Sequence, residues 1–194
     1  MSNITKTYIK NLNINLNQNL KKEFYDFFSK LKHEQYVSLK GRKKDVYCFR
    51  IRKNEIDHLI KNENIKNWID NTIDIIEKKF EIKFLYIVSL IVFPYHGVDP
   101  HIDDRNDRFF IFCWPIFPFR IDLFAPVYVC KYKVEELDDE TNKKLQNDTI
   151  TEEERKYYYE KIIYHDNGIM FNGMTWHYMY NNEYFRLNLQ LVFK

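Results

Sequence analysis

The sequence predicts an α+β protein in which helices support a β-sandwich or jelly roll. Apolar residues recur at helical spacing mainly before residue 82, whereas residues 82–193 hold about eight short stretches rich in β-branched and aromatic residues. Aromatic residues make up 18% of the 194-residue chain, so it can bury a substantial core. Four glycines and five prolines leave little scope for a flexible linker, and we expect one domain over residues 1–194.

The segment before residue 82 is expected to be mainly helical support, with one pair of strands. Apolar residues alternate over residues 12–16, as in a strand, and then recur at helical spacing over residues 19–32. Two short apolar stretches follow at residues 36–39 and 46–51. A turn around Gly41 separates them, so they are predicted to pair as strands.

Two further helices are predicted before the core strands. Asn54 and Asn62 each precede a segment with helical periodicity. Asparagine is a favoured N-cap residue because its side chain accepts a hydrogen bond from a backbone N–H that the helix leaves unpaired. We therefore expect helices over residues 55–61 and 63–79.

Residues 82–194 are expected to form the β core. Residues 82–93 make its first strand, which ends at Pro94. Residues 133–159 are polar and charged, with a capping box at Thr151, so we expect an insertion that contains a short helix. The Asp166-Asn167-Gly168 turn predicts a hairpin between the segments that flank it. The other strand-like segments are residues 109–119, 121–132, 158–164, 169–172, 178–180 and 185–193.

Charge and cysteine content narrow the class of protein. The net charge of +2 gives no general case for nucleic-acid binding, and the basic cluster Lys40-Gly41-Arg42-Lys43-Lys44 is expected to be a solvated turn. Cys48, Cys113 and Cys130 form no CxxC pair, which predicts free thiols in a reducing compartment. We see no signal peptide and no apolar run that would span a membrane, so the expected location is cytoplasmic.

The strongest functional signal is the tripeptide His101-Ile102-Asp103 together with His177. Residues two apart in a strand point to the same face, so His101 and Asp103 are expected to lie side by side. His177 follows His101 by 177 − 101 = 76 residues, enough chain for several strands to bring it back to the same place. Two histidines and one carboxylate cover one face of an octahedral metal and leave the opposite positions open, as in non-haem Fe(II) oxygenases. We predict that these three residues bind Fe(II).

Residues 82–193 resemble the 2-oxoglutarate-dependent Fe(II) oxygenases. The resemblance rests on His101-Ile102-Asp103, on Gly168-Ile169-Met170-Phe171-Asn172-Gly173 leading to His177, and on Arg186, nine residues after that histidine. It implies a double-stranded β-helix (jelly-roll) core, Fe(II) held by the three triad residues, and 2-oxoglutarate whose far carboxylate Arg186 binds. The segment that runs from His177 to Leu189 looks most like the aspartyl/asparaginyl β-hydroxylase-like branch.

The last predicted strand agrees with a role for Arg186. Its residues alternate, so Arg186, Asn188 and Gln190 are expected to face one way, and the three intervening leucines the other. A planar guanidinium binds a carboxylate through two hydrogen bonds at once, which orients it better than a lysine does. Nucleic-acid demethylases of the same superfamily typically carry a second arginine shortly afterwards. Leu191-Val192-Phe193 occupies that region here, which argues against a nucleic-acid substrate.

Other residues are candidates for the lining of the site. Tyr95 and Ser89 are predicted to contact the co-substrate. Tyr86, Trp114 and Arg120 are further candidates, with core packing as the alternative for each aromatic. His96 lies in a loop five residues before His101, where it either touches substrate or co-substrate or is an ordinary loop residue.

The expected activity is hydroxylation of an amino-acid side chain, free or in a peptide, with release of succinate and CO₂. The partners implied are a small-molecule or peptide substrate and O₂, without nucleic acid or membrane. Asp103 favours hydroxylation, because halogenases of the superfamily lack this carboxylate. The alternative is a non-catalytic, cupin-like metal-binding or interaction protein whose basic turn, Lys40 to Lys44, contacts an acidic partner. The insertion at 133–159 is either a lid over the site or a solvated excursion.

Overall fold

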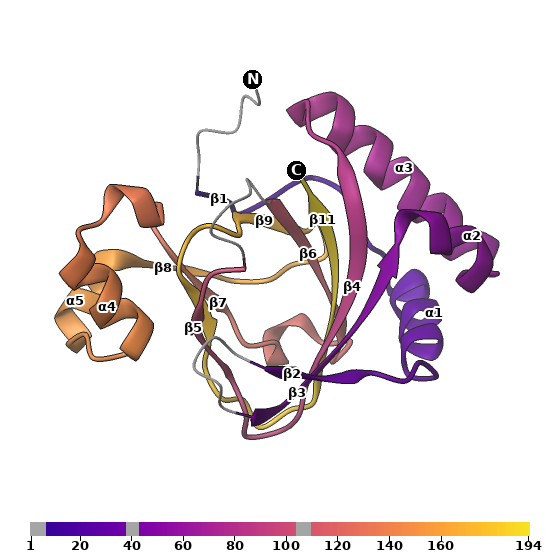
Figure 1. Cartoon of the computed structure of the whole chain (residues 1–194). Coiled ribbons are helices and arrows are strands. Elements are labelled where there is room, and N and C mark those ends of the chain that lie inside the picture. Colours follow the sequence, from indigo (N-terminus) through magenta and orange to yellow (C-terminus); the bar gives the residue numbers. More distant parts are fainter. Residues whose placement is uncertain (1–6, 38–42, 104–109) are drawn as a thin grey trace.

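The strands form two antiparallel sheets that face each other in the computed structural model, which describes residues 7–37, 43–103 and 110–194 (Figure 1). The sheet order, within these residues, is β1-β9-β6-β11-β4-β3-β2 in the larger sheet and β5-β10-β7-β8 in the smaller. The larger sheet comprises β1 (Tyr8–Ile9), β9 (Ile169–Asn172), β6 (Phe110–Phe117), β11 (Arg186–Phe193), β4 (Phe84–Val92), β3 (Lys43–Arg52) and β2 (Glu34–Val37). The smaller sheet comprises β5 (Val98–His101), β10 (His177–Met179), β7 (Val127–Cys130) and β8 (Tyr159–Ile162).

Three helices from the N-terminal part cover the outer face of the larger sheet, as the sequence predicts. They are α1 (Gln18–Phe28), α2 (Ile56–Leu59) and α3 (Glu63–Phe80). Asn62 caps α3, since its side-chain oxygen accepts hydrogen bonds from two backbone N–H groups. Asn54 does not act as a cap, because it lies inside a short 3₁₀ turn, Lys53–Glu55, that leads into α2. The largest hydrophobic cluster of the described residues fills the space between these helices and the sheet.

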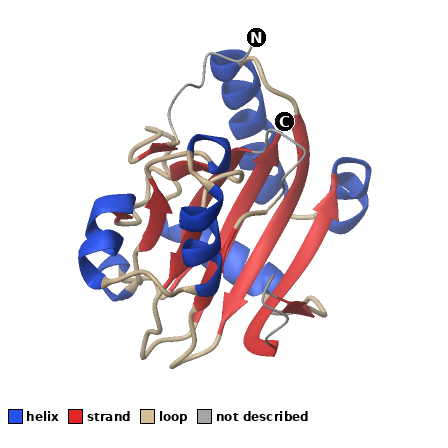
Figure 2. Cartoon of the chain, turned by 60° about the vertical axis from the view of Figure 1, so that its left-hand side comes forward, coloured by secondary structure: helices blue, strands red, loops and turns tan. Residues whose placement is uncertain are grey.

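The insertion packs on the outer face of the smaller sheet. It contains α4 (Asp139–Asn147) and α5 (Glu152–Tyr158), and Thr151 forms the predicted capping box at the start of α5. Leu145 is fully buried in a cluster with Trp176, whose indole N–H donates to Asn142 Oδ1 at 2.9 Å. Helices therefore lie on the outer sides of both sheets (Figure 2), and the space between the sheets is left for a second hydrophobic cluster.

The turn at Asp166-Asn167-Gly168 does not close a hairpin, so that prediction is wrong. β8 and β9, which flank the turn, belong to different sheets. The backbone N–H groups of Leu12, Ile14 and Leu16 donate instead to the carbonyls of residues 168, 167 and 166. Buried and exposed residues thus alternate over residues 12–16, as predicted, and this segment pairs with the turn. The turn leads the chain from the smaller sheet to the larger one. Gly168 has φ +76°, and a Cβ there would lie 2.5 Å from the Trp114 ring, so only glycine fits.

Several other expectations concern the chain as a whole. The strand pair β2–β3 is present as predicted. All three cysteines are free thiols. The basic cluster at 40–44, on which the alternative function depends, falls outside the residues whose side chains the structure describes. Among the helices that are described, none has the length and apolar character needed to cross a bilayer.

Candidate active site

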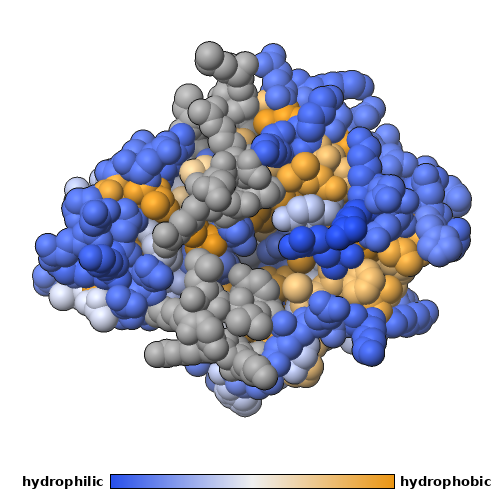
Figure 3. All heavy atoms as spheres, viewed as in Figure 1, coloured by the Kyte–Doolittle hydropathy of each residue, from blue (hydrophilic) through white to orange (hydrophobic). Residues whose placement is uncertain are grey.

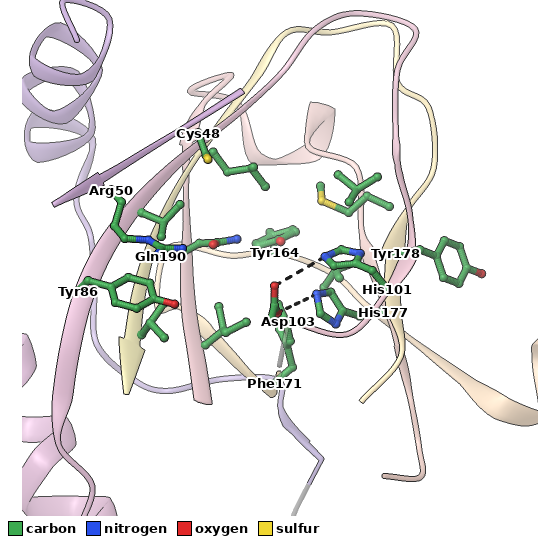
Figure 4. Close-up of a pocket in the computed structure, with 17 residues that line it drawn as sticks. Cys48, Arg50, Tyr86, His101, Asp103, Tyr164, Phe171, His177, Tyr178 and Gln190 are labelled. Atoms are coloured by element: carbon green, nitrogen blue, oxygen red, sulfur yellow. Dashed lines mark ion pairs between the residues drawn. The ribbon is translucent and has the colours of Figure 1, made fainter. Parts of the chain in front are cut away.

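The predicted triad comes together in the space between the two sheets. His101 is the last residue of β5 and His177 the first of β10, and these two residues are directly paired in the smaller sheet. Their ring centroids are 4.2 Å apart. Asp103, two residues beyond His101, turns its carboxylate toward both rings (Figure 4). One ligand atom from each of the three residues can be chosen so that all lie within 4.8 Å of one another, close enough to hold one metal ion.

Backbone carbonyls set the orientation of both imidazole rings. His101 Nδ1 lies 2.7 Å from the carbonyl of Asp99, and His177 Nδ1 lies 2.9 Å from the carbonyl of Thr175. A carbonyl only accepts, so each Nδ1 must carry the proton and donate it. The Nε2 atoms then face the carboxylate, at 3.8 Å from Asp103 Oδ1 for His101 and 3.2 Å from Oδ2 for His177. This is the arrangement by which a neighbouring carbonyl fixes the tautomer of a metal-binding histidine.

The protonation states also suit metal binding. Burial, with a smaller contribution from nearby His177, lowers the pKa of His101 to about 4, so the ring is neutral at pH 7. Burial disfavours the charged form of Asp103, but the interactions with the neighbouring imidazoles, chiefly that of His177, outweigh it and hold its pKa below the ordinary value. A neutral imidazole and a charged carboxylate are the forms that bind a divalent metal.

The low pKa of His101 predicts how the stability of the metal-free protein changes with pH. An unfolded histidine titrates near pH 6.5, so between pH 6.5 and about 4 the unfolded chain binds a proton that folded His101 excludes. The free energy of unfolding should therefore fall as the pH falls through this window, by about 3 kcal/mol from this residue. Urea unfolding at pH 7.0, 5.5 and 4.5 measures the fall. His101→Gln should lose most of it and the exposed His58→Gln should keep it; equal slopes in both variants would contradict the assignment.

A cavity extends from the triad between the sheets and encloses about 820 Å³, including its opening to solvent. Apolar side chains reach the surface near the centre of the face seen in Figure 3. Most of the lining is apolar: Val88, Leu90, Val98, Ile111, Val127, Phe171, Met179 and Val192. The polar exceptions opposite the triad are Arg50, Tyr86 and Gln190 (Figure 4). Of the described residues that line the cavity, none belongs to the insertion, so the structure does not support a lid at 133–159.

Arg186 is fully buried and points into the space between the sheets, as the alternation of β11 predicts. The leucines that alternate with it lie in the cluster beneath the helices. Arg186 Nη2 donates to the carbonyl of His96 at 2.6 Å, whereas Nε and Nη1 have no hydrogen-bond partner among the described residues. The cavity-lining Tyr164 lies nearby. Burial lowers the pKa of Arg186 to about 10, so it remains charged at pH 7.

Two predicted site residues lie elsewhere. Ser89 is on the opposite face of β4, buried toward the helices, and its hydroxyl lies 2.8 Å from His33 Nε2. Tyr95 sits in the loop after β4 with φ +64°, and 71% of its surface is exposed. Neither lines the cavity. The predicted co-substrate contacts at Ser89 and Tyr95 are therefore corrected: strand phase takes the first away from the site, and the loop conformation takes the second into solvent.

Of the remaining candidates, one lines the cavity and the others lie away from it. Tyr86 lines the cavity as predicted. Trp114 belongs to the core beneath the helices, and Arg120 is an exposed partner of Asp122. His96 supplies its carbonyl to Arg186, while its ring lies 3.0 Å from Asp45.

Arg50 also lines the cavity and was not predicted from the sequence. Its only signal was the alternation of residues 46–51, which places position 50 on the same face as 46 and 48.

Comparison with known proteins identifies the fold. No protein-family model matches the chain, and neither does any curated protein. Solved structures do match. The carbocyclase SnoK of nogalamycin biosynthesis, a non-haem α-ketoglutarate-dependent enzyme, matches with a TM-score of 0.65 and 10% identity, over 97% of this chain and 80% of SnoK. HygX from Streptomyces hygroscopicus, solved with nickel and 2-oxoglutarate bound, matches with a TM-score of 0.64 and 7% identity, over 97% and 83%.

A third match is a prolyl hydroxylase from Trichoplax adhaerens in complex with a peptide fragment of hypoxia-inducible factor. Its TM-score is 0.60 at 12% identity, and the match covers 97% of this chain and 84% of the hydroxylase. The chain therefore has the α+β, antiparallel fold of the 2-oxoglutarate-dependent oxygenases. These neighbours include a carbocyclase and a hydroxylase, so the fold alone does not select one reaction.

Proposed function

We propose that the protein is an Fe(II)- and 2-oxoglutarate-dependent oxygenase, built as one domain with a double-stranded β-helix core. His101, Asp103 and His177 are the metal ligands, and Arg186 binds the far carboxylate of 2-oxoglutarate. The observation that carries the proposal is that two features lie together between the two sheets. One is a triad of oriented side chains that can bind a metal, and the other is a buried guanidinium with two nitrogens that have no hydrogen-bond partner in the described part of the chain.

The donor chemistry of the triad fits Fe(II). Two neutral imidazoles and one carboxylate are the ligand set of non-haem Fe(II) oxygenases, and three protein ligands leave coordination positions for a chelating co-substrate and O₂. Both rings are held by backbone carbonyls, so the Nε2 atoms are oriented before metal arrives. Asp103 keeps its side chain about one-third exposed and lines the cavity.

The surroundings of Arg186 fit a carboxylate. A buried charge without a counter-ion is costly, and the described residues offer Arg186 only the carbonyl of His96. Nε and one Nη of a guanidinium form the pair of parallel donors that a carboxylate accepts. The HygX structure, solved with 2-oxoglutarate and nickel, and the SnoK fold support this co-substrate.

When bound, Fe(II) and 2-oxoglutarate supply the activation of O₂ and the oxidation of the substrate, with release of succinate and CO₂. The protein orients both groups and surrounds the reacting space with apolar walls that limit water. We propose hydroxylation of an amino-acid side chain as the reaction. Asp103 and the resemblance of the segment 177–189 to the aspartyl/asparaginyl β-hydroxylase-like branch support it, as does a neighbour that is a prolyl hydroxylase in complex with a peptide.

An anaerobic visible spectrum tests the proposal. Fe(II) is added to the metal-free protein, followed by 2-oxoglutarate. A weak charge-transfer band that needs both additions is expected, because it reports chelation of the metal by the co-substrate. Iron binding without the band would remove the co-substrate from the proposal and leave a metal-binding protein of another kind. Absence of iron binding would remove the enzyme altogether.

A further inference from the structure

The cavity is lined by one guanidinium among its described residues, that of Arg50, on the wall opposite the triad. Arg50 of β3 lies beside Tyr86 of β4 and Gln190 of β11 (Figure 4). Arg50 and Gln190 are both in register with Val88, so they project from the same row of the larger sheet. The guanidinium lies 4.3 Å from the centroid of the Tyr86 ring. A cation over an aromatic face is held in position by the ring's negative charge density, which orients Arg50.

Arg50 differs in its partners from other arginines of the chain. Arg120, which is exposed, and Arg155, which is half-buried, pair with Asp122 and Asp148. No carboxylate of the described residues forms an ion pair with Arg50, although its charge acts within the cavity, where it helps to lower the pKa of Asp103. Arg50 is exposed at the edge of a mainly apolar cavity, and a cation in such a place is an anion-binding group of the kind that fixes the orientation of a ligand.

Arg50 and Arg186 lie at different places along the larger sheet. Their partners on β4 are Val88 and Val92, four residues apart, which corresponds to about 13 Å along a strand. One short dicarboxylate held at the metal and at Arg186 would leave Arg50 without an anion. Arg50 lines the cavity, whereas Arg186 is fully buried and is not among the residues that line it, so an anion at Arg50 would occupy a place separate from Arg186.

We propose that Arg50 binds a carboxylate of the substrate, so that the substrate is a small organic acid with an apolar body. This inference rests on the proposed function and names its substrate class. Arg50 supplies paired N–H donors to the carboxylate, with Gln190 beside it. The valine, leucine and phenylalanine side chains between Arg50 and the triad contact the apolar body, which brings a C–H bond of the substrate to the metal side of the cavity.

Matched acids and amides test this class. The probes are the apolar L-amino acids, hexanoate and phenylacetate, each compared with its carboxamide. Their dissociation constants are measured by calorimetry on the full chain loaded with Zn(II) and 2-oxoglutarate, and also on the metal-free chain. At least one acid should bind the wild type about tenfold or more tightly than its amide. Arg50→Gln should reduce that preference to within about twofold, and Arg50→Lys should give an intermediate value.

Arg52→Gln is the control, because Arg52 lies two residues along the same strand, is exposed and does not line the cavity. It should keep the acid preference. The inference is overturned if no acid binds better than its amide, or if the preference survives in Arg50→Gln. It is also overturned if Arg50→Gln loses 2-oxoglutarate affinity, since Arg50 would then anchor the co-substrate. If neither the wild type nor any variant binds 2-oxoglutarate, that result counts against the proposed function. The preference of the metal-free chain for acids over amides then still decides the role of Arg50.

Discussion

Changing His177 to alanine is expected to lower the Fe(II) affinity of the protein by more than about 100-fold and to abolish succinate formation. Loss of a group that merely orients a metal ligand typically costs 10–100-fold in affinity, and loss of the ligand itself should exceed that range. His177 Nε2 also lies 3.2 Å from the Asp103 carboxylate in the metal-free protein, so removal of the ring changes the surroundings of a second ligand. Anaerobic Fe(II) titration and succinate release from 2-oxoglutarate measure the two effects.

His96→Ala is the matched control for this experiment. His96 is the other histidine near the mouth of the site, and the sequence left its role open. Its ring lies 3.0 Å from Asp45, and the contact it makes with Arg186 uses its backbone carbonyl, which alanine retains. Iron affinity should stay within about threefold of wild type in His96→Ala. If His96→Ala loses iron binding and His177→Ala keeps it, the metal lies elsewhere.

The triad was predictable because local geometry and strand pairing determine it. His101 and Asp103 are two residues apart at the end of a strand, and an alternating strand leaves them on one side. His177 reaches them because β10 pairs with β5 in a register that sets the two histidines opposite each other. The alternation of β11 likewise settles the direction of Arg186, since the leucines between its polar residues can only face the helices.

The predictions that failed concern strands in which polar and apolar residues do not alternate, and contacts between residues far apart in the sequence. Apolar residues fill both faces of β4, so its sequence does not tell which face holds Ser89. The turn at 166–168 has hairpin residues, but its hydrogen bonds go to a segment about 150 residues earlier. Arg50 reaches the cavity only because β3 pairs with β4 at the side of the larger sheet, a pairing that no local motif records.

Arg186→Met is expected to reduce 2-oxoglutarate affinity by at least about thirtyfold, because truncating one partner of a buried, hydrogen-bonded charge pair costs about 2–5 kcal/mol. The same change should not destabilise the ligand-free protein. In that protein the buried guanidinium keeps its charge, and two of its nitrogens find no hydrogen-bond partner among the residues that the structure describes. Methionine removes this cost while filling a similar space. We expect the free energy of unfolding of the ligand-free variant to rise by about 1 kcal/mol.

The two readouts together separate a binding role for Arg186 from a structural one. Calorimetric titration of 2-oxoglutarate into the Zn(II)-loaded protein gives the affinity, and urea unfolding with and without 2-oxoglutarate gives the stability. Co-substrate at 100 times the wild-type dissociation constant should stabilise the wild type by about 2.7 kcal/mol and Arg186→Met by no more than about 0.9 kcal/mol. Arg186→Lys keeps the charge but loses the paired donors, so its affinity should fall between the two. A variant that unfolds more easily yet binds 2-oxoglutarate as tightly as wild type would mean that Arg186 serves the loop at His96 and not the co-substrate.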